Sequence, residues 1–420
     1  MKLTIKTIDN DQYLDFGQKQ DNWSFLHSIE QKRKLQNGQY DTSLIGFVDE
    51  KDELKAAALI AKAPVAKIYQ YCLIPGGILM NYEDEELIKE TTKTLKPWLA
   101  SQNILYMQMS PYLPLIERDQ NGQVVEGGFD HTNIPELFKK AGYKYLPPEK
   151  GYDLSKDPMW MSVLYFDGRD IDTLLKDMDQ QTRWSINRAR KFDLSIREAR
   201  NDADLKKFTD MMIHTGQRNN FDGGDEDYYR REMAAWQDNA DLLLAFMEPS
   251  KTIESQERLK EDSQNELAEV EKKLEETPSS KKFNKKKKVL LEAIELADKK
   301  IDEAQKLCEK YGDEILLAGC IFLNTVNETV YMHSGAYDEF FKYNAPFAIH
   351  YEEIKRAIAA GRKSYNFFGI SGNFNKDEEG YSLFDFKRGF GSTVVENMGT
   401  LILPVKDIEF SIYNRLKKVV

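Results

Sequence analysis

One stretch of the chain, residues 251–310, limits the possible folds more than any other. Glu, Lys, Gln and Asp dominate it, and it holds almost no glycine, proline or aromatic residue. In its second half the apolar residues alternate four and three positions apart, which is the seam of a coiled coil. These residues are Leu290, Ile294, Ala297, Ile301, Ala304 and Cys308. The turn signal Thr277-Pro278-Ser279-Ser280 divides the stretch, so we expect an arm of two antiparallel helices over residues 249–311.

A run of lysines follows the predicted tip of this arm. It comprises Lys281, Lys282, Lys285, Lys286, Lys287 and Lys288. The chain as a whole is acidic, with 59 Lys and Arg residues against 70 Asp and Glu residues and a net charge of -11. This balance disfavours a generally cationic surface for nucleic acid, but binding follows the local field. The run is therefore compatible with a solvated surface. Because it lies at the far end of a long arm, it is also compatible with a contact to a polyanion.

The arm interrupts a regular pattern of strands and helices. Apolar strands are expected at 242–246 before the arm and at 315–323 after it. The N-terminal part has the same order of elements, with strands around 44–71, a long helix near 84–101 and a strand at 104–109. The repeat predicts an α/β fold with mixed sheets in two related domains, interrupted by the inserted arm.

The domain bounds follow from these elements. We expect the first domain at 1–150, with the C-terminal tail at 401–420 returning to it. The second domain is expected at 151–248 and 312–400, on either side of the arm.

Several catalytic signatures are absent from the sequence. It has no Walker loop, no GxSxG elbow, no HExxH and no dinucleotide fingerprint. The five histidines do not cluster, and the three cysteines lack metal-ligand or CxxC spacing, so neither a zinc enzyme nor a serine hydrolase is expected. The nearest approach to a CoA-binding turn, 386–391, begins with Phe. We therefore expect no CoA, no metal and no other cofactor.

The same features bear on location. The N-terminus lacks the apolar region of a signal peptide, and no apolar run reaches the ~18 residues of a membrane span. An odd number of cysteines fits a reducing compartment. We expect a cytoplasmic protein that can also work against the inner face of the membrane.

Two basic segments remain as candidate sites. In residues 381–391, aromatic side chains enclose Lys387, which precedes two glycines. This segment is either an amphipathic helix with a solvated lysine and a glycine cap, or a cation aimed at a phosphate or a developing oxyanion. In residues 182–192, helical spacing puts Arg183 and Arg190 on one face with Arg188 beside it. The segment itself contains no acidic residue, which favours a phosphate contact over a plain surface helix.

Together these features resemble the Fem-type (FemABX) peptidyltransferases, over nearly the whole chain. The segments that carry the resemblance include FLHS at 25–28, IPGG at 74–77, TRWSINRARKF at 182–192, YNAPF at 343–347 and FDFKRGFG at 384–391. The resemblance implies two N-acetyltransferase-like domains that face a cleft. It also implies that the arm is similar to the tRNA-binding arm of seryl-tRNA synthetase.

The resemblance also implies residue roles. Lys387 matches a lysine that faces the donor ester and its phosphates. Residues near the precursor cleft are Arg33, Tyr106, Tyr228, Tyr331, His333 and Tyr343. Gln31 and Gly224 stand where the family usually has Trp and Arg at this cleft. The tRNA contacts would come from Arg183, Arg188 and Arg190 and from the arm residues Lys285, Lys286, Lys287 and Lys288.

The function so implied is transfer of an amino acid from aminoacyl-tRNA to an amine of a peptidoglycan precursor, which builds the interpeptide bridge. The acceptor would be a lipid-linked or a nucleotide-linked muropeptide, and the arm favours the lipid-linked form by analogy. The amine could lose its proton to solvent, to the tRNA or to a carboxylate such as Asp385. The alternatives are a transferase that modifies a protein amine and a non-catalytic protein whose arm pairs with a partner, including a second copy or a related transferase.

Overall fold

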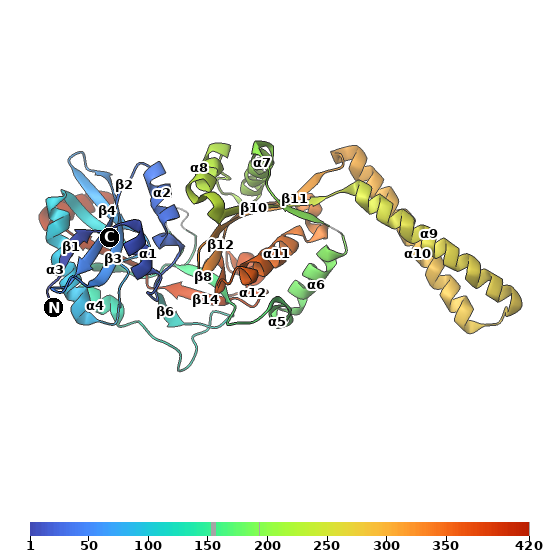
Figure 1. Ribbon diagram of the computed structural model, residues 1–420, viewed down its shortest axis with the longest axis horizontal. Coiled ribbons are helices and arrows are strands. Elements are labelled where there is room, and N and C mark those ends of the chain that lie inside the picture. The colour runs from blue at the N-terminus through green and yellow to red at the C-terminus, as the bar shows by residue number, and fades with distance from the viewer. Residues whose placement is uncertain (153–156, 193, 420) are drawn as a thin grey trace.

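The chain forms two lobes, each built around a mixed sheet, and a helical hairpin extends from the second lobe (Figure 1). The computed structural model describes residues 1–152, 157–192 and 194–419. Over these residues the first sheet has seven strands in the order β1-β2-β3-β4-β5-β15-β7. The second has eight, in the order β6-β14-β8-β13-β12-β11-β10-β9.

The first sheet is antiparallel except between β4 and β5. Its strands are β1 (Thr4–Thr7), β2 (Asp41–Val48), β3 (Leu54–Val65), β4 (Tyr69–Ile74), β5 (Ile104–Met109), β7 (Lys144–Leu146) and β15 (Thr400–Pro404). The helices of this lobe are α1 (Asn10–Gly17), α2 (Ile29–Asn37), α3 (Glu85–Ser101), α4 (Ile134–Lys140) and α13 (Asp407–Lys417), with a short 3-10 turn, η1 (Phe25–His27). The strand cores are almost wholly apolar, and α3 contributes Leu95 and Leu99 to the same buried cluster.

The second sheet is antiparallel except between β12 and β13. Its strands are β6 (Pro114–Glu117), β8 (Trp160–Tyr165), β9 (Ser195–Glu198), β10 (Ala240–Met247), β11 (Ile315–Asn324), β12 (Glu328–Ala336), β13 (Ser364–Gly369) and β14 (Thr393–Asn397). The helices are α5 (Ile171–Asp177), α6 (Gln180–Arg190), α7 (Asp202–Asn219), α8 (Glu226–Trp236), α11 (Ala345–Ala359) and α12 (Tyr381–Arg388). Two separate apolar clusters, one with α11 and one with α7 and α8, show that helices cover both faces of this sheet.

The chain crosses between the two sheets at two strands. β15 lies between β5 and β7 of the first sheet, and α13 packs beside it. β6, in contrast, pairs with β14 in the second sheet, although residues 114–117 fall within the range predicted for the first domain. The two lobes are therefore linked by exchanged strands as well as by surface contact.

The arm consists of α9 (Pro249–Glu276) and α10 (Lys281–Tyr311), inserted between the neighbouring strands β10 and β11 (Figure 1). Of the predicted seam, Leu290, Ala297 and Ala304 are buried between the two helices. The 277–280 segment forms the turn, and the Ser280 hydroxyl accepts a hydrogen bond from the Phe283 N–H at the start of α10. This hairpin and the two mixed sheets confirm the predicted fold class.

Strands β12 and β13 stay together over only part of their length. They pair at three positions, from Glu328 opposite Ser364 to Val330 opposite Asn366, whereas β12 continues beside β11 to Ala336. On its other edge, β13 shifts register against β8 after Asn366, and Phe368 there has a φ of 62°. The sheet therefore parts between β12 and β13, next to Phe368 and Gly369.

Candidate functional site

Lys387 lies in the last turn of α12, where its side chain turns inward and is only 4% exposed. The end of α12 is fixed by the start of α6, because the Asp179 N–H donates to the Gly389 carbonyl at 2.9 Å. The Lys387 ammonium donates a hydrogen bond of 2.6 Å to the carbonyl oxygen of Gly369. Its Nζ also lies 5.7 Å from the centre of the Tyr331 ring. Lys387 thus sits where β12 and β13 part.

The surroundings of Lys387 are aromatic and carry no compensating charge. His350 lies in the middle of a group of rings that comprises Tyr331, Tyr365, Phe367, Phe386 and Phe390. Among the described residues, no acidic side chain forms an ion pair with Lys387. Burial alone lowers the pKa of Lys387 to about 7. A lysine of this kind changes its protonation state near neutral pH.

His350 itself stays neutral at that pH. Burial and the nearby Lys387 charge lower the pKa of His350 to about 3. Its Nδ1 lies 2.7 Å from the Tyr365 hydroxyl. His350, on the buried side of α11, and Lys387 thus lie beside the same ring, that of Tyr331.

Asp385, the predicted proton acceptor, lies apart from Lys387. Residues two apart on a helix point to nearly opposite sides. The Asp385 carboxylate accepts hydrogen bonds from the Arg388 guanidinium and, at 3.3 Å, from the Tyr381 hydroxyl. Its contacts are therefore with the outer side of α12.

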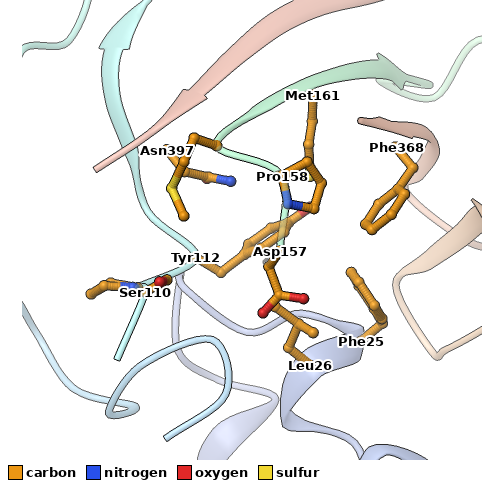
Figure 2. Close-up of a pocket in the computed structure, with 11 residues that line it drawn as sticks. Phe25, Leu26, Ser110, Tyr112, Asp157, Pro158, Met161, Phe368 and Asn397 are labelled. Carbon is orange, nitrogen blue, oxygen red and sulfur yellow. The ribbon is translucent and has the colours of Figure 1, made fainter. Parts of the chain in front are cut away.

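A pocket between the two lobes adjoins the parted strands (Figure 2). Its lining includes Phe25 and Leu26 from η1, Tyr112, Met161, Asp157 and Phe368. Phe368 precedes the glycine whose carbonyl binds Lys387, so the pocket and the lysine flank the same segment of β13. Figure 2 shows the carboxylate of Asp157 directed toward Phe25 and Leu26. Burial raises the pKa of this carboxyl group, and the charge of Lys34 partly opposes the shift.

A second buried carboxylate, Glu328, joins the lobes beside this pocket. It accepts hydrogen bonds from the Phe25 backbone N–H at 2.9 Å and from the Asn366 amide at 3.3 Å. The Tyr112 hydroxyl donates a third, longer one at 3.5 Å. Burial raises the pKa of Glu328. Sequence reasoning missed both Asp157 and Glu328, because neither stands in a motif. The one signal available for Glu328 was its position as an acidic residue at the start of the predicted apolar strand that forms β12.

Several predicted precursor residues gather where α2 meets α8. Tyr228 lies against the His333 ring, with their centroids 5.6 Å apart. The ammonium of Lys34 pairs with the buried Glu232 at 2.8 Å, and the neighbouring Arg33 pairs with Glu30 at 2.9 Å. Burial lowers the pKa of His333 to about 4. The structure therefore brings Tyr228, His333 and the Arg33 helix close to the interlobe surface.

Tyr331 and His333 point to opposite faces of the sheet, although they are two residues apart. The register of β11 and β12 shifts between these two positions, so that Ile321 faces His333 and Phe322 faces Tyr331. Such a bulge reverses the usual alternation of side chains. Tyr331 consequently joins the α11 side with Lys387, and His333 joins the α7–α8 side with Tyr228.

Two of the predicted cleft residues lie elsewhere. Tyr106 is in the first lobe beneath α13, stacked on Tyr71 and packed against Phe410. Tyr343, at the end of a 3-10 segment, η3 (Asp338–Tyr343), packs edge-on against Phe192. Neither lines the pocket between the lobes.

The three arginines predicted to bind tRNA differ in their surroundings. Arg183 donates hydrogen bonds to the Lys176 and Met178 carbonyls, and so caps the end of α5. Arg188 lies over the exposed Trp184 ring at 4.9 Å, and Arg190 lies over Tyr351 at 4.8 Å. Over the described residues, none of the three has an acidic partner.

The arm lysines are partly paired. Lys286 binds Glu266 and Lys287 binds Glu271 across the hairpin, and Lys288 lies 3.8 Å from Glu292 on its own helix. Lys285 has no such partner in the described part of the chain. All four side chains belong to the first turns of α10, close to the tip.

Two further kinds of feature are absent from the described residues. No group of three or more His, Cys, Asp or Glu residues within the described ranges could hold a metal ion. No described helix is both long enough and apolar enough to cross a membrane.

The two mixed lobes with an inserted hairpin define a known class of fold, that of FemX. The crystal structure of FemX matches with a TM-score of 0.83 and 20% sequence identity, over 97% of this chain and 99% of that chain.

The chain belongs to the FemAB family, whose model matches residues 8–418. The aminoacyltransferase FemA of Staphylococcus aureus strain bovine RF122 / ET3-1 is 26% identical over 410 residues, which is 96% of this chain and 97% of FemA. FemA of Staphylococcus aureus strain N315 matches to the same extent. These matches confirm the family predicted from the sequence and place the chain among transferases.

Proposed function

We propose that this chain transfers an amino acid from aminoacyl-tRNA to an amine of a peptidoglycan precursor and so builds the interpeptide bridge. Membership of the FemAB family and the similarity to FemA support aminoacyl transfer. The observation that carries the proposal is Lys387, a buried lysine without an acidic partner among the described residues, whose pKa burial lowers to about 7. Such a group suits proton transfer and charge stabilisation at a reacting ester near neutral pH.

The chemistry requires no covalent intermediate on the protein, because the donor ester is already activated. The amine attacks the ester carbonyl carbon; a C–N bond forms, and the bond to the ribose oxygen of the tRNA breaks. As an ammonium, Lys387 would donate a hydrogen bond to the oxyanion and then give a proton to the departing ribose oxygen. The amine gives one proton to a general base, which later releases it to solvent, and Lys387 regains its proton from solvent. The products are therefore an amide and a free ribose hydroxyl. No CoA enters this scheme.

Asp157 is our candidate for receiving the amine's proton. Its carboxyl group faces the interlobe pocket, where burial raises its pKa, and the pocket adjoins the Gly369 carbonyl that holds Lys387. A carboxylate with a raised pKa is a better base for an ammonium than an exposed one. Asp385 has its contacts on the outer side of α12, which makes it the matched comparison.

The decisive experiment is a cell-free transfer assay with charged tRNA and muropeptide, read by mass spectrometry. Lys387→Ala should lower turnover at least ~10²-fold, the scale for losing one oxyanion contact. Lys355→Ala, on the exposed side of α11, is the control and should retain turnover. Asp157→Asn should slow transfer and shift the acidic limb of the pH–rate profile, whereas Asp385→Asn should do neither. A folded Lys387→Ala protein with normal turnover would refute the assignment of the site.

The acceptor is tested in the same assay by supplying lipid-linked and nucleotide-linked muropeptides in parallel. We expect faster transfer to the lipid-linked form, in line with the arm that the family resemblance associates with it. If only a protein amine is modified, the acceptor substrate is a protein and not a peptidoglycan precursor. If no amine is modified and the arm is found to pair with a partner protein, the chain is a non-catalytic interaction protein.

A further inference from the structure

The outer side of α13 carries a row of three large aliphatic side chains. Ile408, Ile412 and Leu416 are four residues apart and so lie on one side of the helix. They are 76%, 57% and 76% exposed, respectively. The opposite side of α13 packs on the first lobe, where Phe410 is buried and Tyr413 stacks on Tyr106. The helix is therefore apolar on both sides, and the fold buries only one of them.

The turn between β3 and β4 adds a fourth exposed aliphatic residue. Ile68, at this turn, is 70% exposed. The next residue, Tyr69, has its ring 5.0 Å from the ammonium of Lys406, which precedes α13. The turn and the helix thus lie side by side. We call the surface formed by Ile68, Ile408, Ile412 and Leu416 the α13 face.

Cations adjoin the α13 face in the sequence, beside Ile68 and at both ends of α13. Within the described part of the chain, none of the following has an acidic partner: Lys67, Lys406, Arg415, Lys417 and Lys418. Two acids belong to the same helix, Glu409 at the edge of the row and Asp407, which pairs with Lys96 at 3.1 Å. The local excess is positive on a chain whose net charge is -11. An apolar row with flanking lysines and arginines is the composition of helices that lie in a membrane interface.

We propose that the α13 face docks on an anionic lipid bilayer. The helix lies along the surface, its aliphatic row enters the boundary of the acyl chains, and the lysines and arginine reach the phosphates of the headgroups. The C-terminus and the arm lie at opposite ends of the molecule (Figure 1), so that docking leaves the arm in solution. This inference does not depend on the proposed transferase activity.

A second copy of the chain fits this surface less well. Four aliphatic side chains at these exposures offer roughly 400 Å², whereas a stable interface buries about 800 Å² on each partner. The unpaired cations would also face one another across a symmetric contact, which is unfavourable. A bilayer that contains anionic lipid offers acyl chains to the aliphatic row and phosphates to the cations.

The test is flotation of the full-length chain with vesicles of phosphatidylglycerol and phosphatidylcholine in equal amounts, against vesicles of phosphatidylcholine alone. We expect binding to the anionic vesicles that weakens at high salt. The variant Ile408→Gln/Ile412→Gln/Leu416→Gln should bind at least ~30-fold more weakly, because each aliphatic side chain contributes several-fold to partitioning. A control variant changes three aliphatic residues that are exposed elsewhere, Val289→Gln/Leu296→Gln/Val326→Gln, and should bind like the unaltered chain.

Thermal unfolding and sedimentation of each variant complete the experiment. The α13 variant should unfold like the unaltered chain, since its three side chains are exposed. Equal vesicle binding by the α13 variant and the unaltered chain would overturn the proposal, as would failure of the unaltered chain to bind anionic vesicles at low salt. A dimer of the unaltered chain that the α13 variant abolishes, without vesicle binding, would assign the face to a second copy instead.

Discussion

Replacing Lys387 with methionine should stabilise the folded protein at neutral pH while removing the proposed activity. Burial lowers the pKa of Lys387 from 10.5 to about 7. Since each pKa unit corresponds to ~1.4 kcal/mol, holding the ammonium in the folded state below that pKa costs roughly 4–5 kcal/mol. Methionine has a similar length and needs no charge, but it loses the hydrogen bond to Gly369, which costs about 1–2 kcal/mol. We therefore expect a net gain of roughly 2–4 kcal/mol in the free energy of unfolding at pH 6.5.

The pH dependence of this gain has a definite sign. Between about pH 7 and pH 10.5 the unfolded chain holds a proton on Lys387 that the folded chain has lost. The stability of the unaltered protein therefore rises with pH across this window, relative to the methionine variant. By pH 10.5 the cost of the buried charge has vanished, and only the lost hydrogen bond remains. The variant should then be less stable by about 1–2 kcal/mol.

Urea unfolding at 25 °C, followed by circular dichroism at several pH values between 6 and 10, measures this difference. Lys355→Met serves as the control, because Lys355 lies on the exposed side of α11 and, among the described residues, pairs only with Glu352. Its effect on the free energy of unfolding should be small and independent of pH. A Lys387→Met variant that is destabilised at pH 6.5, or whose effect does not change sign with pH, would refute the uncompensated buried charge.

Three further perturbations test other parts of the molecule. Burial raises the pKa of Glu353 to about 8, so the charged carboxylate destabilises the folded state above that pH. Glu353→Gln should therefore stabilise the protein above pH 8 and have little effect below pH 4.5. Urea unfolding at both pH values measures this difference. Arg183→Ala should lower stability by ~1 kcal/mol through loss of the α5 cap. Arg190→Ala should lower it by ~0.5–1 kcal/mol through loss of the Tyr351 contact and should flatten the slope of log tRNA affinity against log salt by somewhat under one. Replacing residues 258–302 with a short glycine-serine turn should leave both lobes folded and raise the KM for charged tRNA but not for muropeptide; an altered oligomeric state with unchanged tRNA kinetics would instead assign the arm to partner binding.

The parts of the fold that the sequence predicted are those set by local patterns. The seam of α10 alternates four and three residues, and Leu290, Ala297 and Ala304 are buried as that spacing requires. The hairpin joins two strands that are neighbours in the sheet, so the flanking apolar runs predicted its place of insertion. The exchange of β6 into the second sheet had no such signal, since a strand of four half-buried residues carries no information about its partner.

The candidate site was predictable only in part, for a similar reason. The aromatic and glycine residues around Lys387 single it out within one short segment. That no described acidic residue pairs with it depends on how α11, β12 and β13 pack together, which the segment does not reveal. Tyr331 and His333 would share a face in a regular strand, and the bulge that separates them is invisible in the sequence. Asp157 and Glu328 gain their importance from contact between the lobes, which no periodicity within either lobe reveals.

The parting of β12 and β13 gives the proposed reaction a place where residues from opposite faces of one sheet could act together. Tyr331 and Lys387 lie on the α11 side, and Tyr228 and His333 lie on the side of α7 and α8. A continuous sheet would separate these two sets, because its backbone hydrogen bonds leave no passage. Here the pairing ends at Val330 and Asn366, and the free Gly369 carbonyl binds the lysine instead of a neighbouring strand. In the proposed reaction, a donor held on one side would meet an acceptor amine held on the other at this edge. The bulge in β12 and the register shift in β13 would then act as parts of the site.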